Sequence, residues 1–384
     1  MRRPSLLRSP GSARALGLAL GVAADLVLAD PRRGHPVAGF GRVAARLERR
    51  LYADSRAAGA AYTAVLVGGA VLAGALGERR VGHGVRAVPA ALLTAVATWA
   101  VLGGTSLVRE GAALGRSLER GELEAARARI PHLCARDPAL LDAAGMARAG
   151  VESLAENTSD AVVAPLFWGA VAGVPGLLGY RAVNTLDAMV GYRSPRHARF
   201  GWASARLDDL ANLAPARLAA VLTAVAAPLV GGRPGAALAA WRRDAREHPS
   251  PNAGPVEAAA AGALGVRLGG RTEYAYGAED RPALGSGPAP VPADLVRAAR
   301  LSRAVGLLSA GAAVVLAAIM PAGRGRGEGQ RGAGVSRSSV SGCRGRGVGS
   351  SSAEGSRSRP ARASRRLALV SRPPRRCSTS SRTK

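Results

Sequence analysis

Three acidic side chains recur at every fourth position in the segment VESLAENTSDAVVAPLFWG. Glu152, Glu156 and Asp160 share one face if the segment is helical. Like charges stacked in this way repel one another, and no Lys or Arg lies between Arg148 and Arg181. Hard cations take oxygen ligands, so the stripe suggests Mg²⁺ or a cationic substrate. The alternative is an ordinary helix N-terminus, where the dipole favours acidic residues.

A second group of carboxylates and amides lies in RAVNTLDAMVGYRSPRHARFGWASARLDDLANLAPAR. Its members pair amides with carboxylates beside an arginine: Asn184, Asp187, Arg206, Asp208, Asp209 and Asn212. Such residues can coordinate a metal-bound nucleotide while arginine neutralises the phosphates. Tyr192, Phe200 and Trp202 concentrate aromatic residues in the same segment. They form either a stacking surface or an interfacial belt.

Two histidines stand beside proline-rich turns. In ADPRRGHPVAGFGR, Asp30, Arg32 and His35 follow an apolar segment. Arg and His there can bind phosphate or carboxylate by charge-assisted hydrogen bonds, although an interfacial basic loop has the same composition.

In REHPSPNAGPVEAAAAGALGVRLGG, a Pro- and Gly-rich turn opens a small-residue helix near Pro255, with His248, Asn252 and Glu257 around it. A helix N-terminus of this kind can bind an anion. The alternative is a simple connecting turn.

Scarce residue types narrow the chemistry. Lys384 is the only lysine, which excludes a Walker-type phosphate loop, a Schiff base and a lysyl general base. Neither the three cysteines nor the five histidines fit a disulfide framework or a zinc site. Phosphate must therefore meet arginine, histidine or backbone N–H groups, and a metal would be held by carboxylates.

The elements that position these clusters are apolar helices. Three uncharged windows have the length of about 20 residues that a bilayer requires: Ala57–Gly77, Ala87–Val108 and Ala304–Gly323. Three weaker candidates are short or contain a charge or prolines: Ala15–Ala29, Ala161–Tyr180 and Leu218–Gly232. We predict an all-α, polytopic membrane helix bundle with four to six apolar segments, some re-entrant, joined by polar helical loops.

Two alternatives concern these segments. A mean hydropathy of +0.08 also fits a soluble, alanine-rich helical bundle, but Ala57–Gly77 offers only Tyr62 and Thr63 as polar residues. The arginines before the first apolar run also fit a cleaved secretory signal. The polar cluster that follows at Asp30 favours a retained helix.

The formal net charge of +27 is concentrated at the C-terminus. Residues 321–384 contain 15 Arg and one Lys against two Glu, with almost no apolar periodicity. Such a segment cannot bury a core, so we predict a disordered Arg/Ser/Gly-rich tail after one membrane domain at 1–320. An RNA- or lipid-binding tail and a frame-shifted reading are alternatives; we expect a solvated extension and no nucleic-acid partner.

The order of the clusters resembles the CobD/CbiB family of cobalamin biosynthesis, the adenosylcobinamide-phosphate synthases. Five motifs carry the resemblance: DPRRGHPV, ESLAENTSDAVVAPLFWG, NTLDAMVGYR, FGWASARLDDLANLAPARL and SPNAGPVEAAAAGALGVRLGG. The resemblance implies a multi-pass ligase of the cell membrane that joins the propionate carboxylate of adenosylcobyric acid to aminopropanol or its phosphate. Forming an amide from a carboxylate implies ATP, an acyl phosphate and Mg²⁺.

On that resemblance, residue roles are hypotheses. Six carboxylates would hold Mg²⁺ and the nucleotide, and one of them would accept the proton of the amine: Glu152, Glu156, Asp160, Asp187, Asp208 and Asp209. All of them except Asp160 would be ligands of the metal. The substrate-binding residues would be Asp30, His248 and Glu257, with Arg32, His35 and Arg206 for phosphate, and Asn157, Asn184, Asn212 and Asn252 for the corrin amides.

The number of spans sets a condition on this site. If all six segments cross, the loops at 30–57, 109–160 and 233–303 face one side and 181–215 faces the other, so the clusters could not meet. If Ala161–Tyr180 and Leu218–Gly232 are re-entrant, four spans remain and every motif shares one face. We predict that this face is cytoplasmic, where ATP and the corrin precursor are found.

Two other functions are alternatives. An intramembrane Mg²⁺-dependent prenyltransferase would need paired Asp-rich motifs, which Asn184-Thr-Leu-Asp187 fits only in part. A transporter would show an inverted repeat of hydropathy, and none is visible. The sequence leaves the amino-alcohol and the oligomeric state open.

Overall fold

The computed structural model describes residues 10–320 except 32–33, 82–86, 193 and 275–276. The predicted tail at 321–384 and Arg32 therefore lie outside the described residues. The first helices of the chain are α1 (Pro10–Leu28), α2 (Pro36–Leu51), α3 (Arg56–Val81), α4 (Ala87–Val101), α5 (Gly104–Glu119), α6 (Leu123–Leu133) and α7 (Ala143–Thr158). Those that follow are α8 (Ala164–Val190), α9 (Trp202–Ala211), α10 (Leu213–Ala226), α11 (Pro234–Asp244), α12 (Ala253–Leu264) and α13 (Pro292–Ile319).

Six segments of the described chain are long and apolar enough to cross a membrane, which fits a multi-pass membrane protein. They are Gly11–Leu28, Arg56–Val81, Ala87–Glu119, Ala143–Val190, Leu213–Val230 and Pro292–Ile319. Each overlaps one of the apolar segments expected from the sequence, so the predicted helical bundle is confirmed. The window Ala87–Val108, predicted as one unbroken helix, divides at residues 102–103 into α4 and α5.

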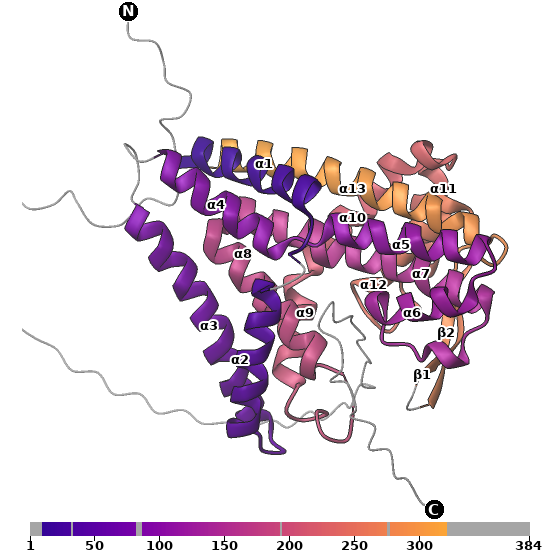
Figure 1. Cartoon of the computed structure of the whole chain (residues 1–384), viewed down its shortest axis with the longest axis horizontal. Coiled ribbons are helices and arrows are strands. Elements are labelled where there is room, and N and C mark those ends of the chain that lie inside the picture. Colours follow the sequence, from indigo (N-terminus) through magenta and orange to yellow (C-terminus); the bar gives the residue numbers. More distant parts are fainter. Residues whose placement is uncertain (1–9, 32–33, 82–86, 193, 275–276, 321–384) are drawn as a thin grey trace, which may run out of the picture.

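The helices form an elongated bundle (Figure 1). Helix α1 packs against both α4 and α13, α2 and α3 project from one end, and α11 and α12 gather at the other. Buried alanine, leucine and valine side chains fill three hydrophobic clusters, the largest of which joins α5, α6 and α7 to the helices from α10 onward.

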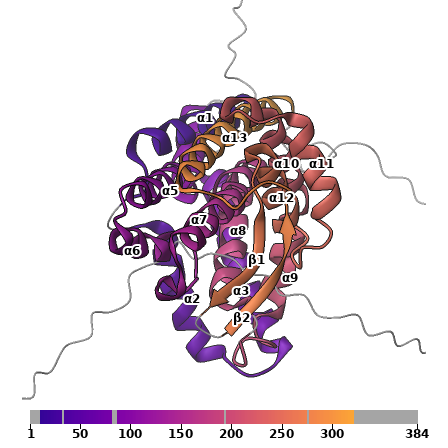
Figure 2. The ribbon, with the colours of Figure 1, turned by 90° about the vertical axis from the view of Figure 1, so that its right-hand side faces the viewer.

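One element was not predicted. Residues of the segment 233–303, expected to be polar and helical, form an antiparallel hairpin of β1 (Leu268–Tyr274) and β2 (Gly277–Leu284). Figure 2 shows this hairpin beside α12. The strands are irregular next to Leu268, and Gly269 and Gly270 both have a φ of 81°, a conformation that side chains disfavour. The hairpin was not predicted because apolar and polar residues do not alternate regularly in this segment.

Helices α7 and α8 form one long unit joined by a π-helical turn at Ser159–Val163. Residues 143–190 would extend roughly 70 Å as a straight helix, more than twice the apolar thickness of a bilayer. The unit breaks at Gly173, whose φ is 66° and ψ −148°. On one side of the break Arg14 of α1 donates to the Ala170 carbonyl (3.1 Å), and on the other Glu78 of α3 accepts from the Val174 N–H (2.9 Å).

The continuation of α8 to Val190 corrects a second expectation. Residues 181–190, predicted as the start of a polar loop, belong to this long helix. The polar side chains of Asn184, Thr185 and Asp187 are consequently held on this helix, where they are buried.

Candidate functional site

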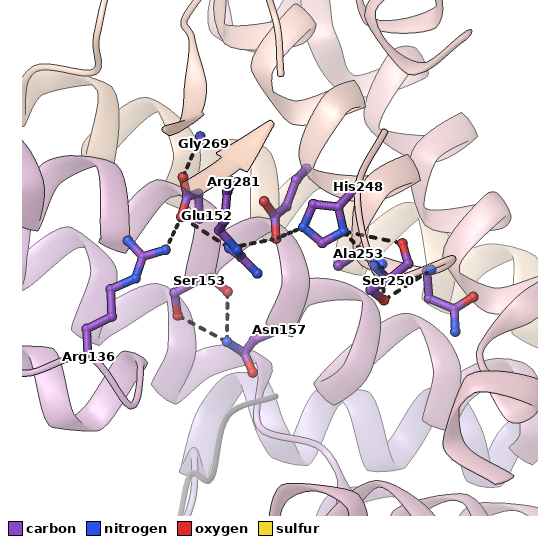
Figure 3. Close-up of polar contacts among 11 residues, drawn as sticks. Arg136, Glu152, Ser153, Asn157, His248, Ser250, Ala253, Gly269 and Arg281 are labelled. Atoms are coloured by element: carbon purple, nitrogen blue, oxygen red, sulfur yellow. Dashed lines mark hydrogen bonds and ion pairs between the residues drawn. The ribbon is translucent and has the colours of Figure 1, made fainter. Parts of the chain in front are cut away.

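A charged network lies buried at the junction of α7, the hairpin and the loop after α6 (Figure 3). Glu152 of α7 is its centre, because its carboxylate pairs with Arg136, lies 3.6 Å from Nη1 of Arg281 and accepts the Gly269 N–H at 2.8 Å. The side chains of Arg136, Glu152 and Arg281 are only 5%, 3% and 8% exposed. One carboxylate thus interacts with arginines from two distant segments.

The network continues to two further side chains. Glu257 of α12 places Oε1 3.8 Å from Nη1 of Arg281 and 3.9 Å from Nε2 of His248. Both distances exceed hydrogen-bond length, and neither oxygen of Glu257 has a hydrogen-bond partner among the described residues. Burial raises the pKa of Glu257 to about 7, although the Arg281 charge opposes the shift. Burial and that same charge lower the pKa of His248 to about 4.

These shifts predict how Glu257→Gln changes stability with pH. The folded-state pKa of Glu257 exceeds its ordinary value of 4.5, so its stabilising contribution is complete below pH 4.5 and is lost as the pH rises through 7. Glutamine does not titrate. The free energy of unfolding of Glu257→Gln relative to wild type should therefore increase by about 2–3 kcal/mol from pH 4.5 to 8.

Denaturant unfolding of both proteins in detergent micelles across that pH range measures the difference. Glu247→Gln, at an exposed site, is the matched control and should give a flat difference. A flat difference for Glu257→Gln as well would show that Glu257 ionises normally in the folded protein.

The turn before α12 links this network to α9 and α10. Nδ1 of His248 accepts the Ser250 N–H at 3.1 Å, so the neutral ring carries its proton on Nε2, toward Glu257. Asn252 donates to the Asp209 carbonyl (2.8 Å) and accepts from Arg217 (3.1 Å). The predicted anion turn is therefore filled by contacts within the protein.

A second cluster joins the π-helical turn to α8. Nδ2 of Asn184 donates to Asp160 at 3.4 Å, and Arg181 donates to Oδ1 of Asn184 at 3.4 Å. Asp30 and Asp160 both act electrostatically on the Arg181 guanidinium. We call Asp30, Asp160, Arg181 and Asn184 the interhelical cluster. Three of the sequence motifs meet in it, and π-helical turns are frequent at functional sites.

His35 has a structural task beside this cluster. Its Nδ1 accepts the Val37 N–H at 3.1 Å and caps α2, while Nε2 lies 3.4 Å from Asp30. Both ring nitrogens are thus engaged. A direct contact between His35 and phosphate would have to replace its contact with Val37 or with Asp30.

Other predicted residues stabilise helix packing. Asn212 donates to Asp208 at 3.1 Å and accepts from the Tyr180 hydroxyl at 2.8 Å, which ties α9 to α8. Asn157 donates to Ser153 on its own helix. Among the other predicted carboxylates, Asp187 is buried, whereas Glu156 and Asp209 are half-buried. The predicted phosphate-binding Arg206 is exposed.

The aromatic residues do not form one stacking surface. Phe200 is fully buried between Tyr52 and Tyr62, with ring centroids 5.4 and 5.0 Å away. Tyr192 and Trp202 are exposed at 44% and 42%. The exposed pair still fits an interfacial belt.

The predicted clusters do meet. Asn252 of the segment 233–303 bonds Asp209 of the segment 181–215, and Asp160 of the segment 109–160 bonds Asn184. A topology that places these segments on opposite sides of a membrane is therefore wrong. Which side they share stays a prediction.

The expected Mg²⁺ ligands do not converge on one point. Within the described ranges, no three His, Cys, Asp or Glu side chains form a group able to hold a metal ion. Mg²⁺ bound with nucleotide needs only one or two protein carboxylates, because phosphates and water complete its shell. The half-buried Glu156 and Asp209 fit that mode, whereas Glu152 is occupied by arginines.

Sequence reasoning missed three arginines of this site: Arg136, Arg181 and Arg281. Only Arg181 carried a signal, as a lone charge after an apolar segment. Arg136 and Arg281 stand in no spacing relation to Glu152.

Fold and site together define a multi-pass membrane protein in which carboxylate, guanidinium and amide side chains from distant segments converge beside apolar helices. The family model described as CobD/Cbib protein matches residues 18–302, a range that includes every residue of the two clusters. The chain belongs to the CobD/CbiB family, as its motifs indicated.

Individual relatives agree. The cobalamin biosynthesis protein CobD of Mycobacterium tuberculosis is 56% identical over 310 residues, which cover 81% of this chain and 97% of that protein. The protein of the same name from Rhodobacter capsulatus is 44% identical over 295 residues, covering 74% and 91%. That from Chromobacterium violaceum is 41% identical over 317 residues, covering 79% and 98%. No solved structure matches the chain.

Proposed function

We propose that this protein is a ligase of cobalamin biosynthesis in the cell membrane that converts adenosylcobyric acid to adenosylcobinamide phosphate. The observation that carries the proposal is family membership across residues 18–302, together with relatives named cobalamin biosynthesis proteins. The shared polar site supports it, since guanidinium and amide groups suit a substrate with carboxylate, phosphate and amide groups.

The reaction consumes ATP. An oxygen of the corrin propionate attacks the terminal phosphorus, which releases ADP and leaves an acyl phosphate. The amine nitrogen then forms the C–N bond while the C–O bond to phosphate breaks. The amine enters as an ammonium ion, so two protons leave its nitrogen, one of which ends on the departing phosphate and one in solvent.

The protein's contribution is to hold charges and move a proton. Asp160 is the proposed proton acceptor, because it lies in the interhelical cluster, where Asn184 reaches it by a long contact of 3.4 Å. Arg181 would face the carboxylate or phosphate oxygens. Mg²⁺ would enter with the nucleotide at Glu156 or Asp209 and neutralise phosphate charge.

The buried network plays a supporting part. Its five side chains contact one another around Glu152, on the same helix as Glu156. We therefore assign Glu152, Glu257 and His248 to positioning α7, α12 and the hairpin rather than to contact with substrate. Asn184 remains the proposed contact to the corrin amides, whereas the side chain of Asn252 is engaged by Asp209 and Arg217.

Incubation of membranes containing the protein with adenosylcobyric acid, ATP and either aminopropanol or its phosphate tests the function. The expected product carries one new amide and its mass identifies the donor. ADP release should require both the acid and the amine. A prenyltransferase or a transporter needs neither, so ATP turnover without the acid, or no product from any amine, would contradict the proposal.

A further inference from the structure

A cleft whose empty space, open solvent included, is about 420 Å³ lies between α1, α5 and α13, outside the buried network and the interhelical cluster. Its walls are mostly apolar, with Val22, Leu26, Leu102 and Leu307 among them. The polar side chains on it are those of Asp25, Thr105, Ser302 and Arg303.

Asp25 is an acid inside an apolar helix. It is only 4% exposed, and its Oδ2 accepts the Thr105 N–H at 3.1 Å and the Thr105 hydroxyl at 2.9 Å. Its Oδ1 is buried without a hydrogen-bond partner in the part of the chain that the structure describes. An ionisable side chain in a membrane helix is costly unless a partner neutralises it. One oxygen is therefore held in place while the other lacks a donor.

The other polar end of the cleft is basic. Arg303 is exposed on α13 and is the last charged residue of that helix, with sixteen uncharged residues between it and the helix end. A ligand that fits both ends carries a cationic donor for Asp25 and an anion for Arg303, with an apolar link between them. A phosphorylated amino-alcohol has this arrangement, because its ammonium and phosphate groups are separated by a short carbon chain.

The cleft also adjoins the interhelical cluster. Val162 lines it and stands two residues after Asp160, and the Gly103 N–H donates to the Ala161 carbonyl at 3.3 Å. Asp30 follows closely after Asp25 in the chain and acts electrostatically on Arg181. A small molecule in the cleft is thus next to the proposed acylation site.

We propose that this cleft binds a phosphorylated amino-alcohol, with the ammonium on Asp25 and the phosphate on Arg303. If the proposed function holds, this phosphorylated amino-alcohol is the amine donor of the reaction; this part of the inference rests on that function. A phosphatidylethanolamine headgroup carries the same two groups, so the experiment separates the two sources.

The test uses the full chain in nanodiscs of phosphatidylcholine and phosphatidylglycerol, titrated calorimetrically with 1-amino-2-propanol phosphate. Asp25→Asn should weaken binding roughly 10- to 100-fold, the usual effect of one charged hydrogen bond. It should leave the weaker binding of isopropyl phosphate, which lacks the amine, unchanged. Arg303→Gln should weaken both. Gly306→Leu keeps Asp25 but narrows the cleft, and should weaken both as well.

Asp54→Asn is the matched control, since Asp54 is exposed and its ion pair with Arg199 spans 3.8 Å. A second set of nanodiscs contains phosphatidylethanolamine, and lipid retained by the protein is measured by mass spectrometry. Retention by wild type, loss in Asp25→Asn and no binding of the free donor would overturn the donor assignment in favour of the lipid. Equal donor binding by wild type and Asp25→Asn would overturn the site.

Steady-state kinetics distinguish a failure of the proposed donor site from a failure of the proposed function. If the wild type forms the amide and Asp25→Asn leaves the KM for the donor unchanged, the site assignment fails and the function stands. If the wild type binds the donor through Asp25 but forms no amide with adenosylcobyric acid and ATP, the proposed function alone fails.

Discussion

Glu152→Gln should lower the free energy of unfolding by about 3–5 kcal/mol, the usual cost of removing one partner from a buried ion pair. Glu152 is the carboxylate that Arg136 and Arg281 share, and all three side chains are less than a tenth exposed. The substituted amide would retain the contact with the Gly269 N–H. It would, however, leave the guanidinium groups buried with less counter-charge.

Thermal and denaturant unfolding of the purified protein in micelles measure this effect. Glu124→Gln is the matched control, because Glu124 is 87% exposed and pairs with Arg127 on the surface of α6. That change should alter stability by less than about 1 kcal/mol. If the two variants unfolded alike, the Arg136–Glu152–Arg281 network would not be important for the fold.

Asp160→Asn should lower the rate of amide formation about 10²- to 10⁴-fold, the range for loss of a general base. The variant should keep its fold, since the new amide oxygen can still accept the hydrogen bond from Asn184. The loss should be in kcat, because proton transfer follows binding of both substrates. The proposal thus separates the positioning task of Glu152 from the chemical task of Asp160.

Initial rates with adenosylcobyric acid, ATP and aminopropanol phosphate provide the measurement. The control is Asp142→Asn at the other end of α7, where the side chain caps the helix through the Gly145 N–H (2.7 Å). Asparagine caps equally well, so activity should be retained. Retained activity in Asp160→Asn would remove the proton-acceptor role, whereas an unfolded variant would assign Asp160 to packing.

The sequence predicted the helices better than the contacts between them. An uncharged window such as Ala57–Gly77 is a local feature, and the structure places the long helix α3 on it. The pairing of Glu152 with Arg281 joins residues 129 positions apart, and no local pattern can encode it. The acidic stripe therefore seemed to lack positive partners, although the fold supplies them from outside the helix.

The same limit explains the amides. Asn212 and Asp208 stand four apart, a spacing compatible with ligand binding, but here they bond each other and Tyr180. Spacing indicates that two groups share a helix face. Whether that face meets a substrate or another helix depends on packing that only the fold defines.

The break at Gly173 has a consequence for how the chain is made. An interrupted helix exposes backbone groups that lipid cannot satisfy, and here Arg14 and Glu78 bond the groups on either side of the break. Both residues precede position 173 and are synthesised first. The two helices that carry them, α1 and α3, can therefore be in the membrane before the broken helix leaves the ribosome. The order of synthesis thus matches the order in which the backbone groups at the break need their partners.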